Sequence, residues 1–126
     1  MDSFIHRDLS HRVLGACFSV HNILGVGLLE SVYEGALVIE FNRLGIPIER
    51  QRVYPVYYKG EMAGAYIADL VVDGRIILEL KSVTQLTQVM EALLLNYLRL
   101  SGIQVGYLIN FRNIKVEWKR FVIGRE

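Results

Sequence analysis

The sequence is poor in cysteine and proline, and it contains no long run of apolar residues. Cys17 is the single cysteine, so no intramolecular disulfide can form, which is typical of a reducing compartment. No apolar stretch approaches the roughly 18 residues that a membrane span needs, and no basic-then-apolar start indicates a signal peptide. We therefore expect a cytoplasmic protein without a membrane segment.

The sequence also lacks an excess of either charge. Its 14 Lys and Arg residues oppose 13 Asp and Glu residues, which gives a net charge of +1. A nucleic-acid partner would therefore have to be bound by a local patch, because the overall charge supplies no cationic field. Hydrophobic residues make up 52% of the chain, which excludes disorder, and the length predicts a single domain over residues 1–126.

Hydrophobic periodicity predicts helices over residues 9–24, 28–44 and 84–100. Between the second and third, residues 48–83 are rich in Val, Ile and Tyr, with turn signals at Lys59-Gly60 and Asp73-Gly74 that divide them into three strands. Residues 103–111 form a further strand. The segment 114–123 alternates loosely, and both an edge strand and a short helix stay open.

A strand, a helix of about 17 residues and another strand form a crossover unit. The strands near Leu78 and Leu108 are therefore expected to be parallel neighbours. The predicted fold class is α/β, with a mixed central sheet flanked by helices on both faces.

Three charged residues interrupt the most apolar hairpin, "YIADLVVDGRIILELKSV". Side chains alternate between the two faces of a strand, and Asp69, Glu79 and Lys81 all occupy odd positions. The even positions are all apolar: Ala68, Leu70, Val72, Ile76, Leu78 and Leu80. Only odd-with-odd pairing keeps one face wholly apolar, so we expect an odd-length turn at Asp73-Gly74.

That turn would set Asp69 opposite or diagonal to Glu79, about 5–8 Å apart at the Cβ atoms. Two carboxylates at this distance repel each other, and a divalent cation relieves the repulsion. Oxygen ligands suit Mg²⁺ or Mn²⁺, and a nearby Lys81 could orient a metal-bound water to cleave a phosphodiester. A structural carboxylate–lysine ion pair at the strand end is the alternative.

The spacing Asp69-x9-Glu79-x-Lys81, ahead of a helix and a parallel strand, resembles that of the PD-(D/E)XK nuclease superfamily. The stretch "GLLESVY", residues 27–33, matches the motif of the GxxExxY protein family, which is assigned to that superfamily. Similarity to sequences of this family extends over "GLLESVYEGAL", "VYYKGE", "ADLVVDGRIILELKSV" and "LLNYLRLSG". The resemblance implies a nuclease-like αβββαβ core, in agreement with the predicted elements.

The resemblance also implies a set of site residues. Asp69 and Glu79 would bind the metal with the backbone carbonyl of Leu80, Lys81 would be the catalytic lysine, and Glu30 would approach from the second helix. Asp69, Glu79 and Glu30 count as catalytic as well as metal-binding.

Three further residues are candidates for substrate binding. Tyr33 shares a helix face with Glu30, Gln51 could line a groove at the start of a strand, and Tyr97 is the tyrosine of a motif that relatives carry on the later helix. A packing role for Tyr33 is the alternative.

The later helix departs from the family pattern. Leu93 stands where relatives often carry Gln, and Met90 stands where they often carry His. Since the metal ligands are unchanged, we expect a metal-dependent nuclease acting on nucleic acid, DNA rather than RNA, which forms a homodimer. The alternative is a weakly active or inactive nuclease-fold protein that binds nucleic acid or a protein partner.

Overall fold

The computed structural model describes residues 4–124, and the elements follow the predicted order. They are α1 (Arg7–Leu24), α2 (Glu30–Arg43), β1 (Ile48–Tyr58), β2 (Glu61–Val72), β3 (Ile76–Lys81), α3 (Gln88–Ser101), β4 (Val105–Asn110) and β5 (Glu117–Val122). The segment 114–123, for which the sequence allowed either an edge strand or a short helix, contains the strand β5. α3 begins four residues later than expected because the Thr87 side chain caps it, accepting a hydrogen bond from the backbone N–H of Met90 at 3.3 Å.

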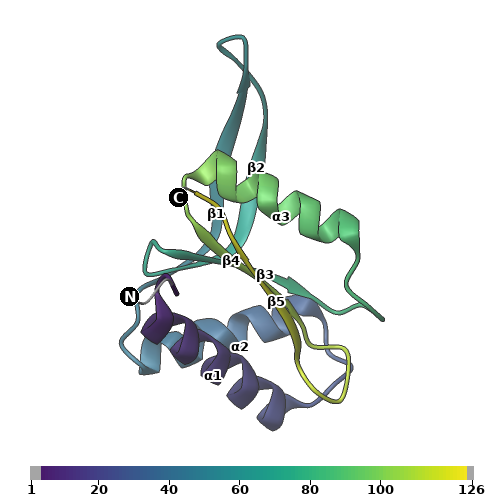
Figure 1. Cartoon of the computed structure of the whole chain (residues 1–126). Helices are drawn as coiled ribbons and strands as arrows, with labels where there is room; N and C mark the ends of the chain where they lie inside the picture. Colours follow the sequence, from purple (N-terminus) through teal and green to yellow (C-terminus); the bar gives the residue numbers. More distant parts are fainter. Residues whose placement is uncertain (1–3, 125–126) are drawn as a thin grey trace.

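The sheet has the strand order β1-β2-β3-β4-β5. β3 and β4 are parallel neighbours and the other pairs are antiparallel, so the predicted crossover through α3 is confirmed. α1 and α2 cover one face of the sheet and α3 covers the other (Figure 1). The mixed α/β architecture is therefore as predicted.

The turn between β2 and β3 has the expected odd length. Val72 pairs with Ile76, which leaves a three-residue loop closed by a 2.9 Å hydrogen bond from the Arg75 N–H to the Val72 carbonyl. Asp73 and Gly74 both have positive φ, 52° and 65°, and glycine adopts that conformation at little cost. Odd positions of β2 consequently face odd positions of β3.

Two hydrophobic cores lie between the helices and the two faces of the sheet. The larger lies between α1, α2 and the sheet, and the smaller lies under α3. Leu70, Val72 and Ile76 pack in the larger core, as the even-position pattern predicts. Ala68 does not, because it packs with Tyr66 in the core under α3. The prediction of one apolar face is therefore wrong at Ala68.

The change of face falls at Asp69. The β1–β2 ladder pairs Arg50 with Leu70 and Arg52 with Ala68, so Gln51 lies at the register position opposite Asp69. Gln51 has a φ of 54°, a left-handed conformation that is costly for a side-chain-bearing residue inside a strand. We attribute the change of face to this local turn of the strand pair.

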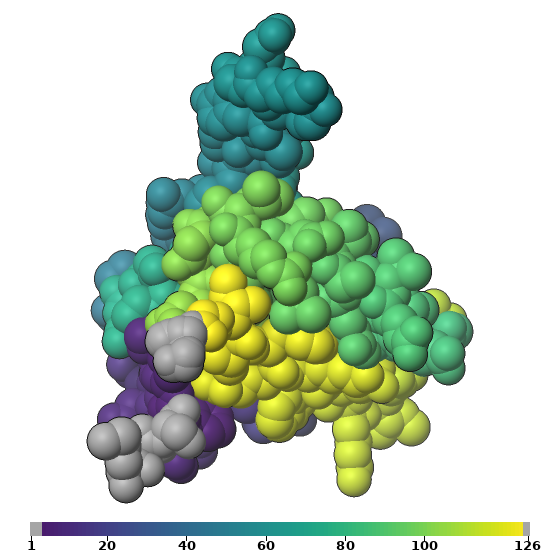
Figure 2. All heavy atoms as spheres, turned by 45° about the horizontal axis from the view of Figure 1, so that its top comes forward, coloured from purple at the N-terminus to yellow at the C-terminus, as the bar shows by residue number. Residues whose placement is uncertain are grey.

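Beyond that point β1 and β2 continue as a two-stranded arm. β3 pairs only with Leu70, Val71 and Val72, so most of β2 has β1 as its single partner. Figure 2 shows the outer part of the pair standing clear of the remaining surface. None of the helices in residues 4–124 has the length and apolar character to cross a membrane.

Candidate functional site

The site lies where β2 and β3 separate. Their ladder ends at Leu70–Leu78, and Asp69 and Glu79 are the next residues outward. Each carboxylate crosses the gap to the opposite strand. Asp69 Oδ2 accepts a hydrogen bond from the backbone N–H of Leu80 at 2.8 Å, and Glu79 Oε2 accepts one from the N–H of Asp69 at 3.2 Å. The predicted approach of the two residues is therefore confirmed.

Glu79 is a buried carboxylate. The Tyr66 hydroxyl donates a 2.5 Å hydrogen bond to Oε2, the oxygen that also accepts the Asp69 N–H. Burial, followed by the charge of Asp69, raises the pKa of Glu79 to about 7. The two hydrogen bonds and the Lys81 charge act in the opposite direction but do not cancel the effect.

The pKa of Asp69 is also raised, chiefly by burial. The charges of Glu34 and Glu30 add to the increase, while the Leu80 N–H and Lys81 oppose it. Four acidic side chains, Asp69, Glu79, Glu34 and Glu30, therefore lie at this edge of the sheet with Asp69 among them, an arrangement that favours binding of a cation.

Glu30 comes to the site from the first turn of α2. Its Oε2 accepts a 3.0 Å hydrogen bond from the backbone N–H of Ser82, directly after β3. Glu30 and Asp69 thus hold backbone N–H groups on either side of Lys81. A carboxylate in a first helical turn is also favoured by the helix dipole.

Lys81 lies with Glu79 on the floor of a cavity under α3. Within residues 4–124 the ion pairs do not include one between Lys81 and Asp69 or Glu79. The alternative of a purely structural carboxylate–lysine pair is therefore not supported.

The donor set fits a hard divalent cation in chemistry. Asp69, Glu79 and Glu30 supply carboxylate oxygens, each with one oxygen engaged by a hydrogen bond, and Leu80 can add its backbone carbonyl. In the part of the chain that the structure describes, no three acidic, His or Cys side chains are close enough to form a metal cluster as they stand. Metal binding here would require the carboxylates to come closer together than they stand.

Tyr33 lies elsewhere than expected. Its ring is fully buried and stacks on Phe111 with the centroids 4.4 Å apart, and its hydroxyl donates a 2.6 Å hydrogen bond to the Gly25 carbonyl. Tyr33 therefore stabilises the connection between α1 and α2 through its hydrogen bond to Gly25, and it has no exposed surface that a substrate could contact. The packing alternative is correct for this residue.

Gln51 reaches a residue that the sequence analysis missed. Glu34 is buried, and it accepts hydrogen bonds from Gln51 Nε2 at 2.8 Å and Arg50 Nε at 2.5 Å. Its position four residues after Glu30 on the same helix face was the available signal. Gln51 is therefore bound to the acidic cluster, beside Asp69 in the strand register.

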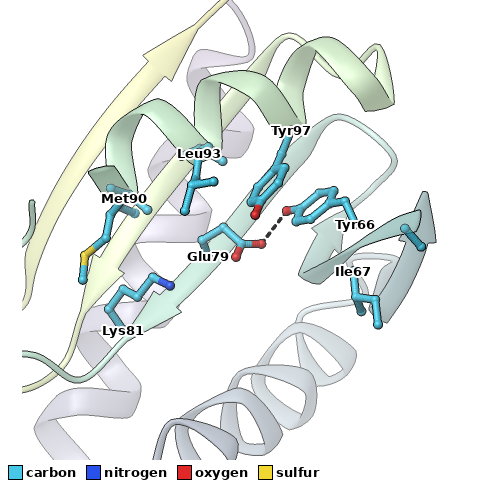
Figure 3. A pocket seen from close by; sticks show the side chains of 10 residues that line it. Tyr66, Ile67, Glu79, Lys81, Met90, Leu93 and Tyr97 are labelled. Atoms are coloured by element: carbon cyan, nitrogen blue, oxygen red, sulfur yellow. Dashed lines mark hydrogen bonds between the residues drawn. The ribbon is translucent and has the colours of Figure 1, made fainter. Parts of the chain in front are cut away.

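Tyr97 lies where a substrate residue was expected. It lines a cavity of about 340 Å³ between α3 and the sheet, and its ring stacks on Tyr66 at a centroid distance of 3.5 Å. Figure 3 shows Met90 and Leu93 on the helix side, with Glu79 and Lys81 opposite them. Tyr66, which binds Glu79, was also missed, because a tyrosine in a strand gives no distinctive signal.

A comparison with protein-family models matches residues 7–121 to a model described as PD-(D/E)XK nuclease superfamily. The chain belongs to this superfamily. Members of the superfamily generally use divalent metals. The match reaches into every strand of the sheet and includes all the candidate site residues.

Two solved structures are similar to this one. The crystal structure of SSO0001 matches with a TM-score of 0.52 and 12% identity, over 94% of this chain and 79% of the other. An alkaline exonuclease, LHK-Exo from Laribacter hongkongensis, matches with a TM-score of 0.45 and 13% identity, over 98% and 73%. Curated proteins gave no match. At 12% identity, the similarity to SSO0001 shows a shared fold.

Proposed function

We infer that this protein is a metal-dependent nuclease of the GxxExxY type, which cleaves phosphodiester bonds of nucleic acid. The observation that carries the inference is the meeting of Asp69 and Glu79 where β2 and β3 separate, with Glu30 and Lys81 beside them. Mg²⁺ or Mn²⁺ would polarise the phosphate and supply an activated water. The preferred polymer is DNA rather than RNA.

The roles of the side chains follow from their positions. Asp69 and Glu79, helped by the Leu80 carbonyl and Glu30, would hold the cation through oxygen atoms. Lys81, on the same strand end, would position the attacking water and balance developing negative charge. Its place beside Glu79 on the cavity floor supports that role.

Calorimetric titration with Mn²⁺ tests the metal site. Asp69→Asn removes one charged ligand and should weaken Mn²⁺ binding at least about tenfold, since even indirect partners of metal ligands have effects of that size. Asp73→Asn on the same hairpin is the matched control, because Asp73 bonds Arg75 in the exposed turn. Equal affinities for the two variants would remove the basis for the site.

Cleavage is tested by incubating single- and double-stranded DNA and RNA with Mg²⁺ or Mn²⁺. Lys81→Ala should slow cleavage by about 10² or more, the range of general acid–base effects. Lys59→Ala, at the tip of the exposed arm, should cut as the parent does. If Lys81→Ala cuts equally fast, the role given to Lys81 is wrong.

A second candidate is a nuclease-fold protein that binds nucleic acid or a protein partner without cutting it. Leu93 and Met90 favour this candidate, because they bring no polar group to the cavity above Glu79. Mn²⁺ binding without cleavage of any of the four polymers would favour it over the nuclease. A homodimer is part of the first proposal, and sedimentation analysis tests it.

A further inference from the structure

The cavity beside Glu79 and Lys81 has two chemically different sides. Toward α3 it is bounded by Met90, Leu93 and the Tyr97 ring, while Glu79 and Lys81 lie on the strand side (Figure 3). Its volume is about 340 Å³, which lies at the lower end of small-molecule sites. The cavity can therefore receive a group about the size of one nucleotide unit.

The apolar side can bind a flat ring and offers few groups that could hydrogen-bond to its edge. The Tyr66 hydroxyl is engaged by Glu79, and Leu93 and Met90 have no strong hydrogen-bonding group, which leaves the Tyr97 hydroxyl as the polar group on this side. Tyr66 and Tyr97 stack in parallel, with 10° between the ring planes, which fixes the Tyr97 ring in place. Because Tyr66 is buried, the surface left for a base is the face of Tyr97 that Tyr66 does not cover. Such a surface favours stacking with any base, because every base has a π-face.

The polar side places a cation next to that surface. Lys81 lies on the cavity floor. Its ammonium group could bind the phosphate attached to a nucleotide whose base enters under α3. A base paired within a duplex is stacked between its neighbours and cannot enter without being extruded, which costs a few kcal/mol. An unpaired base avoids that cost.

We propose that this cavity binds the base of one unpaired nucleotide beside the cleaved phosphate. The substrate would be a single strand, or a duplex opened at that nucleotide. The inference rests on the proposed nuclease function, because that function supplies the phosphate at Lys81.

The test measures binding of a short fluorescent DNA single strand in the presence of EDTA, where no cleavage occurs. Oligonucleotides with an abasic site at each position in turn, and the matching blunt duplex, are compared. Binding should fall about tenfold for one abasic position, in line with the energy of stacking one base on an aromatic ring. The duplex should bind more weakly than the single strand.

Leu93→Asp locates the effect in the cavity. Leu93 and Leu100 both lie on α3 and are 43% and 46% exposed, so an Asp at either position keeps contact with water, and Leu100 lies outside the cavity. The abasic penalty should disappear in Leu93→Asp and persist in Leu100→Asp. Thermal melting of both variants checks that they fold.

Each outcome separates this inference from the proposed function. Equal binding of the intact and abasic strands, or of strand and duplex, would overturn the base site, even if the protein cuts DNA with Mn²⁺. That result is also expected if the cavity receives a side chain of a protein partner. An abasic penalty without any cleavage would retain the base site and reject the nuclease.

Discussion

The buried carboxylate of Glu79 should make the metal-free protein less stable as the pH rises. Well below pH 4.5 Glu79 is protonated in both the folded and the unfolded chain, so it adds no pH dependence to the unfolding free energy. Between pH 4.5 and about 7 the unfolded chain releases the proton while the folded chain keeps it. Above about pH 7 the folded protein must hold the ionised carboxylate beside Asp69.

The size of the effect follows from the two pKa values. A change from 4.5 to about 7, at about 1.4 kcal/mol per unit, corresponds to about 3 kcal/mol of unfolding free energy. Glu79→Gln removes the titration and keeps an oxygen that can accept the Tyr66 hydroxyl and the Asp69 N–H. The unfolding free energy of the parent, relative to Glu79→Gln, should therefore fall by about 3 kcal/mol between pH 4.5 and pH 8.

Urea denaturation in EDTA, followed by far-UV circular dichroism at several pH values, measures this difference. EDTA is needed because a bound cation would stabilise the ionised form of the parent. Glu61→Gln, which removes an exposed carboxylate at the tip of the arm, is the control and should track the parent at every pH. A difference between parent and Glu79→Gln that stays constant, or grows in favour of the parent, would refute the reasoning.

Three further predictions concern the scaffold. Gly106→Ala should destabilise the protein by about 1–3 kcal/mol in urea denaturation. The reason is that the new Cβ would lie 3.0 Å from Leu98 Cδ2 and 3.1 Å from Leu94 Cδ1 on α3. Unchanged stability would show that α3 can move away from the sheet at no cost. Cys17 should resist thiol reagents in the native protein and react on unfolding, because it is fully buried and burial raises its pKa to about 12. Labelling is measured by absorbance, and rapid labelling of the native protein would contradict that burial. Lys59→Asn should raise the melting temperature slightly, corresponding to a few tenths of a kcal/mol, because Lys59 has a φ of 50° in a two-residue turn that favours Asn; a lower melting temperature would contradict it.

The sequence predicts the framework of the site because that framework depends on local signals. Glycines end the helices, and the apolar pattern of the hairpin specifies the odd-length turn that brings Asp69 and Glu79 together. The parallel pairing of β3 with β4 follows from the crossover rule. These features need no knowledge of distant contacts.

The parts that the sequence does not predict depend on tertiary contacts. Tyr33 shares a helix face with Glu30, yet its ring packs on Phe111, which directly follows β4. No local pattern indicates that contact. Tyr66 is one tyrosine among several in the strands, and only the fold brings its hydroxyl to Glu79. Helical spacing thus identifies residues on a common face but does not say which of them remain exposed.

Gln51 links the unpredicted part of the fold to the site. A left-handed side-chain-bearing residue costs about 1–2 kcal/mol, and a strand sequence gives no reason to expect one. Here two donors, Gln51 Nε2 and Arg50 Nε, satisfy the buried Glu34 carboxylate, and hydrogen bonds to a charged group are worth enough to offset that cost. The same local turn accompanies the change of face at Asp69, whose carboxylate reaches the Leu80 N–H across the open end of the ladder. Glu34 therefore helps to hold the strand pair in the shape that the acidic site requires, without being one of its proposed ligands.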